Sequence, residues 1–165
     1  MPILTKNYNC IDMEVYMLAD GFKNRYTTIP FAIYKDFNEK SSNLFAHYHK
    51  EVELIAVVKG AIDFYIDSSC YKMKAGEVLV IPPYCLHRSH LYEKTYHECI
   101  CFDLSILWDD ALRRDLEKGA LTVNSHLDLS LPYTPMIYNS VRSAIMAYES
   151  RQKGWEMQVI GNPPG

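Results

Sequence analysis

Hydrophobic and polar positions follow one pattern up to about residue 104 and a different pattern beyond it. In the first part, short runs rich in β-branched and aromatic residues are separated by turn signals such as Lys59-Gly60, which is typical of β-strands. Many short strands at this spacing predict a mainly β domain, a sandwich or barrel, over residues 14–104. The predicted strands are Phe31–Phe37, Leu44–His49, Glu53–Val58, Ile62–Ile66, Cys70–Met73, Val78–Ile81 and Tyr96–Leu104.

After residue 105 the apolar positions repeat with a helical period. One helix is predicted over residues 106–120 with Ser105 as its N-cap, a second over residues 136–153, and a short third over residues 155–160. A barrel closes its own core, so we expect the apolar stripe of the second helix to form the interface of a homodimer, with packing inside the chain as the alternative. The stripe consists of Ile137, Val141, Ala144, Ile145 and Tyr148.

Composition narrows the class of protein. The 165 residues are 48% hydrophobic and carry a net charge of −3, which fits a folded domain with its own core. No block of Lys and Arg stands out, so the sequence does not look like a complete nucleic-acid-binding domain. No apolar run approaches the ~20 residues of a membrane span, and the N-terminus lacks a secretory signal pattern. We therefore expect a cytoplasmic protein with no membrane partner.

The five cysteines are expected to be reduced. They stand at positions 10, 70, 85, 99 and 101 and include no C-x-x-C pair, so neither a disulfide framework nor a zinc knuckle is favoured. Cys99 and Cys101 alternate with apolar residues on the last predicted strand, and we expect them to be core thiols and not metal ligands.

Three histidines and one glutamate have the spacing of a binding site. His47 and His49 stand two residues apart, so on a strand both imidazoles face the same side, and Glu53 opens the next strand, where its carboxylate can join them. His87 follows an apolar strand and a Pro-Pro turn. Three imidazoles and a carboxylate that converge inside a barrel are a ligand set for Zn²⁺, Ni²⁺, Mn²⁺ or Fe²⁺. A pocket for an organic ligand without a metal and a purely structural cluster are the alternatives.

These residues resemble the two motifs of cupin proteins, G-x5-H-x-H-x3,4-E-x6-G and G-x5-P-x-G-x2-H-x3-N. The matching positions are His47, His49, Glu53, Gly60, Gly76, Pro82 and His87. Ser41, Tyr84 and Leu91 depart from the motifs, because they stand where the motifs have Gly, Gly and Asn. The resemblance implies a double-stranded β-helix barrel of two antiparallel sheets, with the ligands near one open mouth.

A narrower resemblance covers residues 30–160. The runs from Glu53 to Gly60 and from Tyr71 to Pro83 are similar to the effector-binding domain of AraC-type bacterial transcription regulators. This resemblance implies an N-terminal arm over residues 1–13, a cupin barrel over 14–104 and a helical dimerisation segment over 105–160. It also implies that a small effector, often a sugar, binds at the cluster of histidines and glutamate, with Tyr8 of the arm folding over the pocket.

Two functions follow from these patterns. The first is the ligand-sensing and dimerisation domain of a transcription regulator, which contacts DNA only through a C-terminal helix-turn-helix domain that this sequence does not contain; we expect either a truncated chain or a stand-alone relative. The second is a stand-alone metal-dependent cupin enzyme, an isomerase or a dioxygenase, which the complete ligand set supports. The helices after the barrel favour the sensor.

Overall fold

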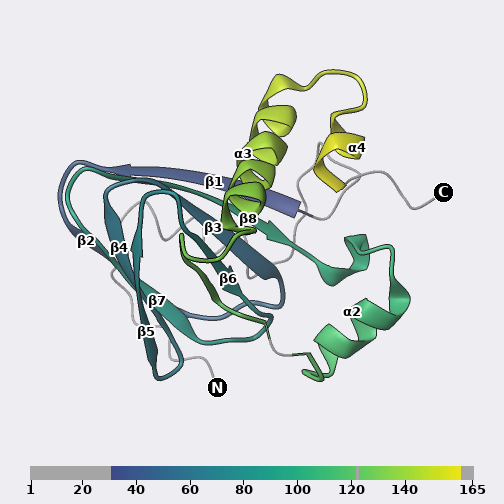
Figure 1. Ribbon diagram of the computed structural model, residues 1–165, viewed down its shortest axis with the longest axis horizontal. Coiled ribbons are helices and arrows are strands. Elements are labelled where there is room, and N and C mark those ends of the chain that lie inside the picture. Colours follow the sequence, from purple (N-terminus) through teal and green to yellow (C-terminus); the bar gives the residue numbers. More distant parts are fainter. Residues whose placement is uncertain (1–30, 122, 161–165) are drawn as a thin grey trace.

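Two antiparallel sheets form a barrel in the computed structural model, which describes residues 31–121 and 123–160 (Figure 1). Within these residues the larger sheet has the strand order β1-β8-β3-β6-β9 and the smaller sheet the order β2-β7-β4-β5. The prediction of a mainly β barrel of two sheets, followed by helices, is confirmed. The strands are β1 (Phe31–Asn38), β2 (Ser42–His47), β3 (Val52–Lys59), β4 (Ala61–Ile66), β5 (Ser69–Lys74), β6 (Val78–Ile81), β7 (His87–Leu91), β8 (Thr95–Phe102) and β9 (His126–Leu127).

Two of these strands, β7 and β9, are absent from the sequence prediction. The sequence of β7, His-Arg-Ser-His-Leu, lacks the β-branched and aromatic residues that mark strands. It is nevertheless a strand because it lies inside the smaller sheet, where it pairs with both β2 and β4. The two-residue β9 pairs with the edge of β6. In both cases the neighbouring strands, and not local preference, determine the conformation.

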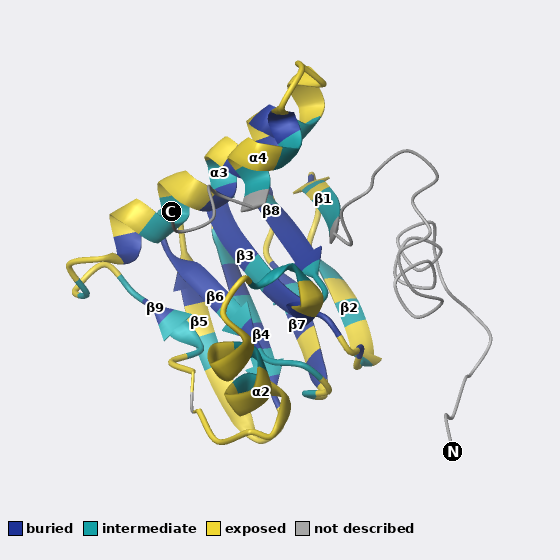
Figure 2. Ribbon diagram, turned by 90° about the vertical axis from the view of Figure 1, so that its right-hand side faces the viewer, coloured by how far each residue is buried: buried dark blue, intermediate teal, exposed yellow. Residues whose placement is uncertain are grey.

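The space between the two sheets is filled by an apolar core. On β3, Ile55 and Val57 face this core, whereas Leu54 and Ala56 pack on the opposite side of the sheet. Figure 2 shows β3 and β8 mostly in the colour of buried residues. Because both faces of β3 are covered, its sequence is a nearly continuous hydrophobic run and not an alternation.

Gly60 ends β3 at a hairpin, as the sequence predicts. Its φ is +81°, a left-handed backbone conformation that side chains disfavour. A Cβ atom added here would lie 2.6 Å from Oγ1 and 2.9 Å from Cα of Thr95. Thr95 is buried, and its hydroxyl donates a hydrogen bond to the carbonyl of Ala61. The close approach of these two chain segments therefore requires glycine.

The first predicted helix is shorter than its pattern indicates. A 3₁₀ turn, η1 (Leu104–Ile106), precedes α2 (Asp110–Glu117). The Asp109 carboxylate accepts hydrogen bonds from two N–H groups in the first turn of α2, while Asp103 caps η1. Separate caps begin separate helical turns. The prediction of one helix with Ser105 as its N-cap is therefore wrong.

The other predicted helices are present as α3 (Thr134–Ser150) and α4 (Trp155–Ile160). Helix α3 lies across the outer face of the larger sheet, where it contacts β3 and β8 (Figure 1). A second apolar core forms there, in which Ala56 and Ile100 of the sheet pack against α3, and Trp155 of α4 completes it. The helices thus cover one face of the barrel from outside.

The apolar stripe of α3 packs within the chain and not on a free surface. Val141, Ala144 and Ile145 are only 3%, 8% and 1% exposed in the single chain. Ile137 and Tyr148 are half-buried. The expected dimer seam is corrected accordingly: the barrel closes its inner core, but the outer face of β3 and β8 is also apolar and needs a cover, which α3 provides. The homodimer itself stays a prediction.

Some expectations lie outside the described residues, namely the arm over residues 1–13, Tyr8 within it, and residues 14–30 of the predicted barrel. Of the helices in the described ranges, none is long and apolar enough to cross a membrane.

Candidate metal centre

Three of the four predicted ligands lie on strands of two sheets that face each other, and the fourth lies in a turn between the sheets. His47 ends β2 and pairs with His87, which begins β7, in the smaller sheet. Glu53 of β3 pairs with Cys101 of β8 in the larger sheet. His49 lies in the turn between β2 and β3, not on the predicted strand, because the chain crosses from one sheet to the other between residues 47 and 52. One end of the barrel therefore gathers all four side chains.

The three imidazole rings lie against one another. The ring centroids of His47 and His87 are 4.2 Å apart, those of His49 and His87 are 5.1 Å apart, and those of His47 and His49 are 6.0 Å apart. One ring nitrogen from each histidine lies within 4.8 Å of the other two. His49 and His87 are buried, and His47 is half-buried. The histidines that the sequence spacing selects are thus neighbours in the structure.

Each histidine is oriented by its Nδ1 atom, which lies within hydrogen-bond distance of a backbone carbonyl two residues away. The pairs are His47 with Phe45 at 2.9 Å, His49 with Glu51 at 3.1 Å, and His87 with Cys85 at 2.9 Å. A carbonyl oxygen only accepts, so Nδ1 carries the proton and Nε2 of a neutral ring keeps its lone pair. Histidines that bind metals are typically held by such contacts at the second nitrogen.

The Glu53 carboxylate joins two of the rings. Its Oε2 lies 3.3 Å from Nε2 of His49, which donates a hydrogen bond to it when the ring carries both protons, and 3.4 Å from Nε2 of His87. Burial raises the pKa of Glu53, but the two histidines outweigh burial and hold this pKa well below its usual range. Burial lowers the pKa of His49, but Glu53 outweighs it and raises that pKa above the ordinary value. Burial and the neighbouring His87 lower the pKa of His47 to about 4, so this ring is neutral near pH 7.

This donor set fits a divalent metal ion. Nε2 of His87 is buried and has no hydrogen-bond partner among the described residues, although Glu53 Oε2 is close. When His87 is neutral, both atoms are acceptors with no proton between them. A cation that is coordinated by both atoms would satisfy the buried nitrogen and remove the repulsion between the two acceptors. Three nitrogens and one carboxylate oxygen suit Zn²⁺, Ni²⁺, Mn²⁺ or Fe²⁺.

Cys101 adds a group that the sequence interpretation assigned to the core. Its sulfur lies within 4.8 Å of ligand atoms of His49 and Glu53. Cys101 is indeed buried, as is Cys99. Burial raises the pKa of the Cys101 thiol well above its ordinary value, so the thiol stays protonated unless a cation lies beside it. The pairing of β3 with β8, which the sequence does not give, brings this thiol to the site.

A small cavity opens beside the cluster inside the barrel. Its volume is about 110 Å³, and His47 and Glu53 form part of its wall. His97 also lines it, and burial lowers the pKa of its imidazole. The rest of the wall mixes polar and apolar side chains, namely Tyr34, Lys35, Asp36, Ser42, Asn43, Leu44, Ile55, Phe64, Ser89, Leu91 and Cys99. A molecule in this cavity reaches the histidine cluster directly.

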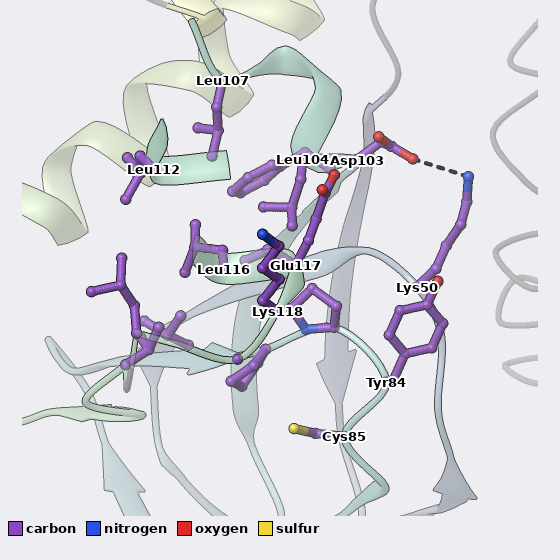
Figure 3. A pocket seen from close by; sticks show the side chains of 18 of the residues that line it. Lys50, Tyr84, Cys85, Asp103, Leu104, Leu107, Leu112, Leu116, Glu117 and Lys118 are labelled. Atoms are coloured by element: carbon purple, nitrogen blue, oxygen red, sulfur yellow. Dashed lines mark hydrogen bonds and ion pairs between the residues drawn. The ribbon is translucent and has the colours of Figure 1, made fainter. Parts of the chain in front are cut away.

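A larger cleft of about 740 Å³ lies outside the barrel, between α2 and the outer face of the larger sheet. Figure 3 shows apolar side chains around it, among them Leu107, Leu112 and Leu116. At its edge Lys50 and Asp103 form an ion pair of 2.9 Å. No cluster of metal-binding groups in the described part of the chain faces this cleft. Among the described residues the clustered metal-binding groups lie in the barrel, so the barrel cavity is the candidate site.

Two facing antiparallel sheets, with three histidines and a glutamate gathered at one end, define a cupin-type barrel. The chain belongs to the family of AraC-like ligand binding domains, whose family model matches residues 32–161. The resemblance in the sequence motifs is thereby confirmed. No curated protein matches this chain.

Solved structures of cupins are similar to this chain over part of its length. An RmlC-like cupin from Shewanella frigidimarina shares 18% identity at a TM-score of 0.41, and the match covers 43% of this chain and 64% of that protein, less than two thirds of its length. A cupin superfamily protein from Desulfitobacterium hafniense shares 12% identity at a TM-score of 0.44, with 47% and 70% covered. A putative mannose-6-phosphate isomerase from Ralstonia eutropha shares 20% identity at a TM-score of 0.41, with 44% and 74% covered.

Proposed function

We propose that this chain is the ligand-sensing domain of a bacterial transcription regulator in the cytoplasm, and that its effector binds in the barrel cavity. The observation that carries the proposal is the cavity itself, which lies between the sheets of an AraC-like ligand binding domain with His47 and Glu53 in its wall. Small-molecule sites are typically concave, with a few polar groups among apolar walls, and this cavity has that composition.

The size and lining of the cavity favour a small polar effector. Its volume of about 110 Å³ is well below the roughly 300–1,000 Å³ of pockets for drug-sized ligands. Asn43, Ser89 and His97 offer hydrogen-bonding groups in the wall. We propose a ligand no larger than a single sugar or a small organic acid. A divalent ion held by the histidine cluster would supply a Lewis-acidic contact for an oxygen atom of this ligand.

Calorimetric titration with monosaccharides and small hydroxy acids tests this proposal, using protein treated with a chelator and protein loaded with Zn²⁺. Ser89 is buried in the cavity wall, so Ser89→Leu fills the cavity and should abolish binding. Ser140→Leu changes an exposed position on α3 and is the matched control. Binding that survives Ser89→Leu would place the effector elsewhere, and the outer cleft of Figure 3 would be tested next.

We also propose that residues 105–160 serve a homodimer and that DNA contact belongs to a helix-turn-helix domain outside this chain. The net charge of −3 favours no direct contact with phosphates, and two-fold protein symmetry matches paired DNA half-sites. Large apolar side chains remain exposed on the helical segment, namely Trp108, Leu112, Met136, Met146 and Met157. Sedimentation equilibrium over a range of concentrations tests this, and a monomer at the highest concentration would contradict it.

Metal-dependent catalysis is the second candidate function. The cavity reaches His47 and Glu53, so a small molecule has access to an ion bound by the cluster, as a catalytic metal requires. Incubation of a bound ligand with metal-loaded protein, followed by NMR, separates the two functions. A ligand that returns unchanged supports the sensor. Conversion that stops in His87→Ala supports an isomerase or dioxygenase.

A further inference from the structure

Glu51 is a buried carboxylate in the turn that carries His49. Its side chain has no exposed surface, and neither carboxylate oxygen has a hydrogen-bond partner among the described residues. Burying a carboxylate is strongly unfavourable unless donors or a positive charge accompany it. Buried polar groups without partners are rare in folded proteins and require an explanation.

The adjacent lysine does not balance this carboxylate. Lys50 is exposed, and its Nζ lies 2.9 Å from Oδ2 of Asp103. The group that does face Glu51 is the imidazole of His49, whose Nδ1 lies 3.7 Å from Oε2 of Glu51 and 3.1 Å from the backbone oxygen of the same residue. Glu51 therefore places two acceptors, its carbonyl and its carboxylate, on the side of His49 opposite the cluster.

We propose that Glu51 is a positioning residue of the metal centre, which holds the His49 ring and supplies the second negative charge that balances a divalent cation. The inference rests on the proposed metal centre. With Glu53 among the ligands and Glu51 behind His49, two carboxylates face two positive charges, so the buried site is neutral when loaded. A carboxylate behind a metal-binding histidine fixes the orientation of the ring and raises the basicity of its other nitrogen.

Neither sequence motif points to this residue. Position 51 falls among the unspecified residues between His49 and Glu53 in the first motif. The signal is the combination of complete burial, two unpartnered oxygens and the 3.7 Å approach to His49, and only the folded chain shows it.

Glu51→Gln tests the inference, because it removes the charge and keeps the shape. Zn²⁺ affinity is measured by competition with a chromophoric chelator, and we expect a loss of about 10- to 100-fold, the usual effect of removing a carboxylate behind a ligating histidine. The visible spectrum of the Co²⁺-loaded variant should shift, since His49 is held differently. Without metal, the variant should unfold at the same temperature as the wild type or higher, because a buried carboxylate without hydrogen-bond partners has been removed.

Glu77→Gln is the matched control, because Glu77 is also a buried carboxylate beside a histidine, with His126 Nε2 3.0 Å away, but lies outside the cluster. It should leave Zn²⁺ affinity and the Co²⁺ spectrum unchanged. Glu51→Asp, which keeps the charge, should retain most of the affinity. Wild-type affinity in Glu51→Gln, or failure of that variant to fold without metal, would show that Glu51 serves only the fold. A wild type that binds no metal would instead overturn the proposed metal centre itself.

Discussion

Glu98 of β8 and Arg142 of α3 form an ion pair, with Nε 2.7 Å from Oε2, where the helix crosses the larger sheet. The Glu98 side chain is only 3% exposed, and Nζ of Lys35 lies 3.8 Å from its other oxygen. On both sides of Glu98 along β8, His97 and Cys99 line the barrel cavity. One strand thus carries cavity residues on one face and the attachment of α3 on the other.

Arg142→Met should weaken the attachment of α3. The change leaves the buried Glu98 carboxylate with Lys35 as its remaining cation, and we expect the free energy of unfolding to fall by about 1–3 kcal/mol. The expected loss of free energy is not larger than this because the Arg142 side chain is 33% exposed, so solvent screens the ion pair. Urea denaturation followed by circular dichroism measures the loss. Arg113→Met, which breaks an exposed pair with Asp110, should cost less than about 0.5 kcal/mol, and equal losses in the two variants would contradict a special role for Arg142.

Ile145→Ala should destabilise the single chain. Ile145 is 1% exposed in the core between α3 and the sheet, so the truncation leaves a cavity and should lower the free energy of unfolding by about 2–4 kcal/mol. Met146→Ala, at an exposed position on the same helix, should cost little. The pair Val141→Asp and Ile145→Asp should unfold the protein, as judged by near-ultraviolet circular dichroism. If the double variant instead stays folded and only loses a dimer, the apolar stripe of α3 is a dimer interface after all.

His87→Ala should remove metal binding. His87 supplies the buried Nε2 atom that lacks a partner, so its loss opens the ligand set, and we expect Zn²⁺ affinity to fall by more than about 100-fold. Elemental analysis of purified protein and Zn²⁺ titration measure the effect. His126→Ala is the control, because His126 pairs with Glu77 away from the cluster. If the wild-type protein contains no metal and takes none up, the metal centre is contradicted. The remaining interpretations of the cluster are then a pocket for an organic ligand and a purely structural cluster.

Tyr84→Gly should stabilise the protein slightly. Tyr84 stands where the second motif has glycine, and its φ of +62° is the left-handed conformation that glycine adopts freely. Relief of this strain, about 1–2 kcal/mol, outweighs the greater entropy of glycine in the unfolded chain and leaves a gain of up to about 1 kcal/mol. Tyr48→Gly, at an exposed position without positive φ, should instead lower the unfolding temperature. Calorimetry measures the unfolding temperature of both variants. A loss of stability in Tyr84→Gly would contradict the prediction and mean that the Tyr84 ring stabilises the protein by more than the strained backbone destabilises it.

The class of fold and most of the candidate site are predictable from local sequence pattern. Periodicity is a local property, so the change from strands to helices near residue 105 is visible without any contact. The spacing of His47, His49, Glu53 and His87 can likewise be recognised in the sequence as a motif, because each of these residues stands at a fixed distance from a turn. Local pattern did not predict β7, whose residues are strand only because β2 and β4 pair with them.

Which surface each apolar or polar face contacts depends on the tertiary structure. The apolar stripe on α3 indicates from the sequence that one side of the helix is covered. A dimer interface and the outer face of a sheet would both produce this stripe. In the structure the stripe packs on β3 and β8, so the sheet is the cover. Cys101 lies beside Glu53 because of the register between β3 and β8, and Glu51 lies 3.7 Å from His49 within the turn between β2 and β3. These contacts depend on pairing between residues far apart in sequence or on the path of one turn. Hydrophobic periodicity contains no information about either of them.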